Sequence, residues 1–174
     1  MRVICLFLFV SFAGRLPAQA PPSKEGFVDE VLSRMDSNGS GFYLIAGSDT
    51  CRFEKFDYDE WVKYHLQASV PLTTLNELAY KVHLARQPYF WQQARLKRAK
   101  CINAGTADSL LATRSGYQIF SLSQPQFTDD GQFAVIDINW KRDLIRGGGY
   151  TLLFRRTPDG WRSIGTKQNW GNNQ

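Results

Sequence analysis

The sequence predicts an α+β domain in which N-terminal helices pack on a C-terminal four-strand antiparallel meander. Two observations predict this class. Apolar residues recur at helical spacing between about residues 24 and 115, whereas from Gly116 the chain consists of β-rich runs separated by turn residues. Hydrophobic residues make up 43% of the 174 residues, which suits one globular core. We therefore expect a single domain over 19–174, with the helical part at about 24–115 and the β meander at about 116–170.

The first residues have the layout of a secretory signal peptide. Arg2 precedes an apolar run that is too short to span a membrane, and small residues follow. Cleavage after Ala18 is favoured over cleavage after Ala20, because the second cut would place the fixed ring of Pro21 just past the scissile bond. The sequence therefore predicts a secreted or periplasmic protein with signal peptide 1–18 and no membrane span after its removal.

Several helices and one early strand are expected in the first part of the mature chain. Capping boxes predict two helix starts, one from Asp57 with Glu60 and one from Thr74 with Glu77. The segment 103–106 has the composition of a breaker. The expected elements are a helix at 25–35, a short buried strand at 42–47, helices at 57–70, 75–86 and 89–101, and a helical turn near Leu110.

The four strands of the meander are expected at 116–123, 132–140, 149–156 and 160–167. The pairs Asp130-Gly131 and Asp159-Gly160 are hairpin signals, and the glycines at 147–149 allow positive backbone angles for a tight turn. Alternation within the second strand places Asp137 on its more polar face. The early strand at 42–47 could join the edge of this sheet.

A second arrangement of the same elements is the cone-shaped α+β fold of the ketosteroid-isomerase class, in which helices and a curved sheet enclose a pocket. There Asp137 would be the general base of a hydrolase or isomerase, assisted by Tyr117 or Tyr150. A carboxylate enclosed by apolar walls has the raised pKa that this role needs.

The segment 36–47 has part of a calcium-binding loop. Asp36, Asn38 and Ser40 occupy its first, third and fifth positions, with the required glycine at Gly41. The twelfth position is Gly47 instead of the bidentate glutamate, and a strand follows in place of an exiting helix. The stretch therefore indicates a helix stop and a turn, and no metal or cofactor is expected.

Two cysteines remain once the signal peptide is removed. In an oxidising compartment Cys51 and Cys101 are expected to form one disulfide, which would stabilise the fold by about 4 kcal/mol in the chain-entropy model. The alternative is a pair of buried thiols.

Charge divides unevenly between the two halves of the mature chain. Residues 19–77 hold 5 basic and 10 acidic residues, and residues 78–174 hold 14 and 6, which gives net charges of −5 and +8. We expect the halves to fold together and offset each other. The triple glycine lacks the following lysine of a phosphate-binding loop, so no nucleic acid or nucleotide partner is expected.

Four blocks in the chain resemble a group of uncharacterised secreted or lipid-anchored proteins of Bacteroidota. The blocks are "LNELAYK" (75–81), "YFWQQARLKRAKCI" (89–102), "SQPQFTDDGQFAVIDIN" (123–139) and "GWRSIGTKQNW" (160–170). The resemblance covers about residues 72–171 and implies export and a single domain, but no activity. Similar sequences often hold cysteines in the hairpin corresponding to 141–150, where this chain has none.

No complete catalytic or metal-binding constellation is present in the sequence. The function predicted is therefore a non-catalytic binding or interaction module of the cell envelope or extracellular space. Its expected partner is an envelope or extracellular protein or a glycan. The alternative is the small pocket enzyme that uses Asp137.

Overall fold

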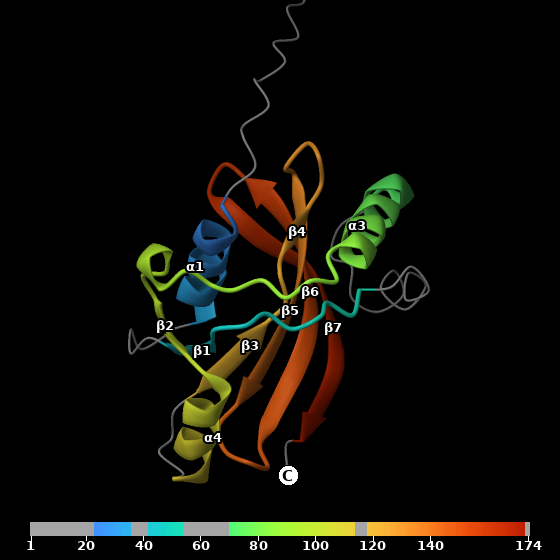
Figure 1. Cartoon of the computed structure of the whole chain (residues 1–174). Helices are drawn as coiled ribbons and strands as arrows, with labels where there is room; N and C mark the ends of the chain where they lie inside the picture. The colour runs from blue at the N-terminus through green and yellow to red at the C-terminus, as the bar shows by residue number, and fades with distance from the viewer. Residues whose placement is uncertain (1–22, 36–41, 54–69, 114–117, 173–174) are drawn as a thin grey trace, which may run out of the picture.

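One mixed sheet of seven strands, with helices on both of its faces, forms the computed structural model (Figure 1). It describes residues 23–35, 42–53, 70–113 and 118–172. The strands are β1 (Phe42–Ile45), β2 (Ala99–Ile102), β3 (Ile119–Leu122), β4 (Gln126–Phe127), β5 (Phe133–Lys141), β6 (Gly147–Thr157) and β7 (Gly160–Asn172). The helices are α1 (Lys24–Met35), α3 (Leu72–Leu84) and α4 (Ala104–Ala112), with a 3-10 turn, η2, at Gln93–Arg95.

The sheet is larger than the predicted meander, and it is mixed. Its strand order is β2-β1-β3-β5-β6-β7, and β4 also pairs with β5. β1 runs parallel to both neighbours, pairing Tyr43 with Lys100 in β2 and with Ile119 in β3. The other ladders are antiparallel. The prediction of helices combined with antiparallel strands is confirmed. The prediction of a four-strand sheet is wrong, because β1 lies inside the sheet and not at its edge. The sheet is open, since its two end strands, β2 and β7, do not pair with each other.

Three helical predictions are confirmed and one is wrong. The amphipathic segments at 25–35 and 75–86 form α1 and α3, and the helical turn expected near Leu110 is part of α4. The segment 89–101 forms no helix; it contains η2 and then enters β2, because backbone pairing with β1 takes its last residues. The helix expected at 57–70 lies outside the described residues, as does its capping box.

Two helix starts also differ from the prediction. α3 begins two residues before Thr74, after Pro71, and no side chain caps it. Glu77 instead accepts a hydrogen bond from Asp129 N at 2.6 Å, which ties α3 to the β4–β5 turn. The expected breaker at 103–106 starts α4, since the Asn103 side chain accepts from Thr106 N.

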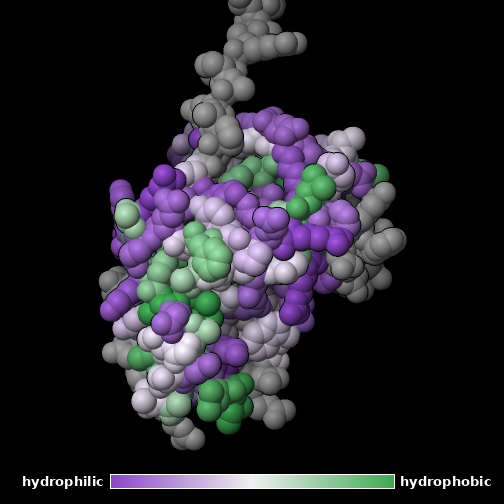
Figure 2. Space-filling view, in the orientation of Figure 1, coloured by the Kyte–Doolittle hydropathy of each residue, from purple (hydrophilic) through white to green (hydrophobic). Residues whose placement is uncertain are grey.

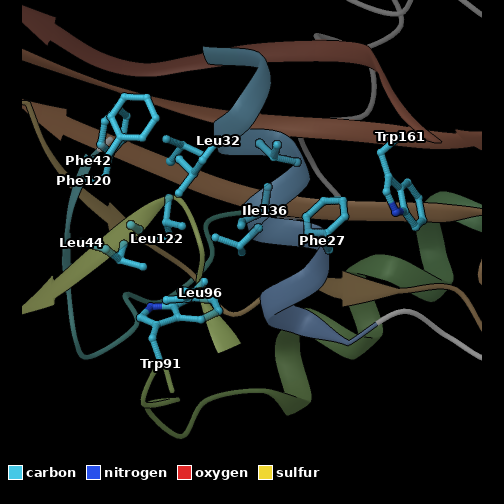
Figure 3. Packing of buried hydrophobic residues seen from close by; sticks show 14 of the residues in the cluster. Phe27, Leu32, Phe42, Leu44, Trp91, Leu96, Phe120, Leu122, Ile136 and Trp161 are labelled. Atoms are coloured by element: carbon cyan, nitrogen blue, oxygen red, sulfur yellow. The ribbon is translucent and has the colours of Figure 1, made fainter. Parts of the chain in front are cut away.

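α1 packs on one face of the sheet and forms the main core (Figure 3). Its Phe27 makes edge-to-face contacts with Phe154 and Trp161, with ring centroids 5.3 and 5.1 Å apart. The even-numbered residues of β5 point to this face, and Ile136 is fully buried. This cluster holds the first and last thirds of the described chain together.

α3 and α4 pack on the opposite face, at separate places. α3 covers Val135 and Leu153 near the β4–β5 turn. α4 covers Ile102 in β2 and Ile119 in β3. The part of this face between α3 and α4 is therefore lined by neither helix, and Figure 1 shows the strands running between them.

Glycines serve two different purposes in the β part. Gly131 and Gly160 have φ angles of 65° and 102°, as the two predicted hairpin turns require. The run at 147–149 has no positive φ and belongs to β6. A Cβ at Gly149 would collide with Asn139 and Trp170, so this run provides space for side chains and not a turn.

Candidate functional site

Polar side chains line the sheet face between α3 and α4. They come from β3 and the residue that follows it, from β5, β6 and β7, and from the segment that follows β1. We call them the polar strip, which consists of Asp49, Ser121, Ser123, Asp137, Asn139, Thr151 and Asn169. The strands place them together because residues at alternate positions share a face, and strand register then aligns them.

Asp137 is the centre of the strip and is 1% exposed. Its Oδ2 accepts a hydrogen bond from Arg52 N at 2.7 Å, and its Oδ1 accepts one from Thr151 Oγ1 at 2.6 Å. The Cys51 thiol donates to Oδ1 at a sulfur–oxygen distance of 3.5 Å. Both carboxylate oxygens are thus occupied by the protein itself. Asp137 fixes the backbone of the segment after β1 onto the sheet.

Burial controls the protonation of this centre. It raises the pKa of Asp137 above the ordinary value of 3.8, although the hydrogen bonds from Thr151 and Arg52 act in the opposite direction. Burial and the neighbouring Asp137 charge also raise the pKa of the Cys51 thiol. A thiol with a raised pKa stays protonated and is a poor nucleophile. The pair therefore serves structure better than covalent catalysis.

The disulfide predicted between Cys51 and Cys101 is not formed, since both cysteines are free thiols in the structure. They lie on opposite faces of the sheet. Cys51 contacts Asp137 on the face of the polar strip, whereas Cys101 pairs with Leu44 in register and packs against the α1 core. The sheet itself separates the two sulfur atoms.

Of the two predicted partners of Asp137, the structure describes Tyr150, and it does not lie beside the carboxylate. Tyr150 pairs with Ile138 and therefore projects from the other face of the sheet, away from the carboxylate. Tyr117 lies outside the described residues, as do Asp36, Asn38 and Ser40 of the incomplete calcium loop. Thus the described residues place no second acid or base of the predicted set beside Asp137.

The outer half of the polar strip is more open. Asp49 is exposed, and its Oδ2 accepts hydrogen bonds from Ser121 Oγ and from Asn139 Nδ2, the latter at 3.1 Å. Asn139 Oδ1 in turn accepts from Trp170 Nε1 at 2.9 Å. This chain of contacts joins the segment after β1 to the last strand. It holds the Trp170 ring over Gly149.

A second exposed feature lies beyond the sheet, at the β5–β6 turn, residues 142–146, which we call the hairpin tip. Leu144 and Ile145 are 70% and 69% exposed. The turn is closed by a backbone hydrogen bond from Arg142 N to Arg146 O at 3.0 Å. Asp143 Oδ1 accepts from Ile145 N at 2.9 Å and from Arg146 N at 2.6 Å. The two aliphatic side chains are therefore presented on a fixed backbone.

Sequence reasoning found Asp137 but missed most of what surrounds it. The missed residues are Asp49, Arg52, Ser121, Ser123, Thr151 and Asn169. Polar residues at alternate positions in "IFSLS" and "VIDIN" were a usable signal, since neighbouring strands with this pattern place their polar residues on one face. The role of Arg52 had no local signal, because it acts through its backbone N–H.

Within the described ranges, no cluster of three or more histidine, cysteine, aspartate or glutamate side chains could hold a metal ion. Among the helices that the structure describes, none has both the length and the apolar character needed to cross a bilayer.

Comparison of this chain with family models, curated proteins and solved structures finds no match.

Proposed function

We propose that this chain is an exported, non-catalytic binding module of the cell envelope or extracellular space, and that it binds through the hairpin tip. The observation that carries this proposal is the exposure of Leu144 and Ile145 on a turn held by Asp143. A binding surface that is already ordered loses little conformational entropy on association. Large exposed aliphatic side chains gain free energy when a partner covers them.

The state of Asp137 favours binding over the alternative pocket enzyme. A general base must reach a substrate proton directly or through one water. Asp137 is buried, and its oxygens accept hydrogen bonds from Arg52 N and Thr151 Oγ1. It can be described fully as an anchor for the segment after β1. Among the described residues, the raised pKa of Asp137 is the feature that supports the enzyme hypothesis.

Export is tested by mass spectrometry of the protein recovered from the periplasm or the medium. The expected N-terminus is Gln19, from cleavage after Ala18, and Pro21 is the alternative. Recovery of the chain only in the cytoplasm, with Met1 or Arg2 retained, would contradict export.

Binding is tested by sedimentation of the exported protein with isolated cell envelopes. The double variant Leu144→Ser/Ile145→Ser is expected to stay in the supernatant while the wild type sediments. The double variant Leu72→Ser/Leu84→Ser is the matched control, because these α3 residues are 51% and 61% exposed. It is expected to sediment like the wild type.

Two outcomes would overturn the proposal. One is equal sedimentation of the wild type and the hairpin-tip variant. The other is turnover of a small metabolite that Asp137→Asn abolishes while the variant stays folded by circular dichroism, which would establish the enzyme alternative.

A further inference from the structure

The hairpin tip combines an apolar end with a cationic base. Figure 2 shows a hydrophobic patch at the lower end of the molecule, where Figure 1 places the β5–β6 turn. The aliphatic residues there are Leu144 and Ile145. Lys141, Arg142 and Arg146 flank them and are all exposed. The apolar side chains and the positive charges therefore occupy one small projection.

Only one of these cations is neutralised within the described part of the chain. Arg146 Nε donates to Asp143 Oδ2 at 2.7 Å and forms an ion pair. Neither Lys141 nor Arg142 takes part in an ion pair with another described residue. Arg142 lies beside the Gln118 side-chain amide, which is neutral. The projection thus carries a net positive charge next to its apolar end.

The same end of the sheet carries a further lysine. Strand register places Lys100, Tyr43, Ile119 and Lys141 in one row across four strands. Alternation then directs the two lysines to the same face of the sheet. Adjacent strands are about 4.8 Å apart, so three steps separate the lysines by roughly 14 Å. Positive charge therefore continues from the hairpin tip along this end.

We propose that the hairpin tip binds the surface of an anionic phospholipid bilayer, with Leu144 and Ile145 entering the interface and Lys141 and Arg142 facing the headgroups. The charge complementarity between the base of the tip and anionic lipid selects this partner. Apolar residues flanked by lysine and arginine match the layered chemistry of a membrane surface, in which anionic headgroups cover hydrocarbon. This inference rests on the proposed function, because it names the partner of the same tip.

The expected affinity is modest and depends on salt. Each aliphatic side chain contributes roughly tenfold to the partition coefficient, since most of its surface leaves water on insertion. Each unpaired cation near an anionic surface contributes roughly fivefold at low ionic strength. Binding is therefore expected to weaken as the salt concentration rises.

The test is co-sedimentation of the exported protein with vesicles of phosphatidylcholine, with and without phosphatidylglycerol. We expect binding only when phosphatidylglycerol is present. Leu144→Ser/Ile145→Ser is expected to reduce it roughly 100-fold, and Lys141→Gln and Arg142→Gln roughly fivefold each. The α3 control Leu72→Ser/Leu84→Ser is expected to bind as the wild type does.

Insertion is read separately with Ile145→Trp, whose fluorescence emission is expected to shift to shorter wavelength on adding phosphatidylglycerol vesicles. Excess free glycerol phosphate is expected not to compete. Competition by this soluble anion would overturn bilayer recognition in favour of a headgroup-sized anion site. Absence of wild-type binding to either vesicle, or equal binding by the hairpin-tip variant, would also overturn it.

The lipid inference and the proposed function fail in different ways. If the hairpin-tip variant loses binding to whole envelopes but the wild type does not bind protein-free vesicles, the tip is a binding site for an envelope protein or glycan. The proposed function then stands and the lipid inference is wrong. If the variant still binds envelopes, both are wrong.

Discussion

Asp137 and Thr151 face each other as a register pair across β5 and β6, and the Thr151 hydroxyl donates to Asp137 Oδ1 at 2.6 Å. The other oxygen accepts from Arg52 N, so the carboxylate joins two strands to the segment after β1. Replacing Asp137 with alanine removes the acceptor of the part-buried Arg52 N–H and leaves the Thr151 hydroxyl with Asn169 as its remaining partner. We expect a loss of about 2–4 kcal/mol in the free energy of unfolding, measured by urea denaturation.

Asp137→Asn is the matched control for this change, because the amide keeps the shape and one acceptor oxygen. The Thr151 hydroxyl can rotate to accept from the new amide nitrogen. We expect a loss of about 1 kcal/mol for this variant. A loss in Asp137→Ala no larger than that in Asp137→Asn would contradict the anchoring role.

The raised pKa of Asp137 predicts a pH dependence of stability. The folded state binds this proton more tightly than the unfolded state, whose pKa is near 3.8. The wild type therefore gains stability from Asp137 below about pH 4 and loses it as the pH rises through the folded pKa. The difference in unfolding free energy between wild type and Asp137→Asn should fall over this window. A difference that rises with pH would show that the folded pKa is lowered.

The two free cysteines should react at different rates. Burial raises the pKa of both thiols, and Cys51 is also hydrogen-bonded to Asp137. We expect Cys51 to react with iodoacetamide roughly tenfold more slowly than Cys101 in the folded protein. Denaturant should remove the difference. Peptide mapping under non-reducing conditions is expected to find no link between them, and a linked peptide would contradict their placement on opposite faces.

Gly149 should not tolerate a side chain. A Cβ there would collide with Asn139 Oδ1 and with the Trp170 ring, whose mutual hydrogen bond closes the outer polar strip. We expect Gly149→Ala to cost about 1–3 kcal/mol of unfolding free energy. Gly105→Ala is the control, because its nearest contact is 3.6 Å from the new Cβ. As a helical position, it should be neutral or slightly stabilising.

Glu30 should contribute to docking of α1 on the sheet. Its Oε1 accepts from Trp161 N at 2.6 Å and from Arg34 Nη2 at 2.9 Å. Removal of this carboxylate in Glu30→Ala leaves the half-buried Trp161 N–H without its partner. We expect a loss of about 1–2 kcal/mol by urea denaturation. Glu30→Gln, which retains an acceptor, should lose less, and equal losses would assign the effect to charge instead.

The turn at the hairpin tip should weaken at low pH, because the ionised carboxylate of Asp143 holds it. Hydrogen bonds from the N–H groups of Arg146 and Ile145 hold the pKa of this carboxyl at about 2. Its contribution to the turn is therefore present above about pH 4 and is lost as the pH falls towards 2. Carboxyl titration by NMR checks this value. A midpoint near the ordinary 3.8 would mean that the turn is not held in this way.

Local signals predicted the elements that carry their own pattern, such as α1 and the two glycine turns. They did not predict the structure of the segment 89–101. Its residues favour a helix, but Ala99–Ile102 pair in parallel with β1 and form a strand. No local pattern indicated that β1 would pair with both β2 and β3. At the site, alternation identified the face of Asp137, but its partner Arg52 N is contributed by a distant segment. The secondary-structure propensities of residues do not predict such a long-range contact.

The position of β1 between β2 and β3 determines when the protein can fold. Tyr43 pairs with Ile119 in β3, and β3 needs β5 beyond it, so the sheet joins residues from both ends of the chain. Such long-range pairing gives a high contact order, and folding on the order of milliseconds to seconds is expected. A fragment that stops before Ile119 lacks the strand on one side of β1. For a chain that we propose is exported, this topology delays completion of the sheet until β3 and β5 have been synthesised, which favours passage of the unfolded chain through a translocation channel.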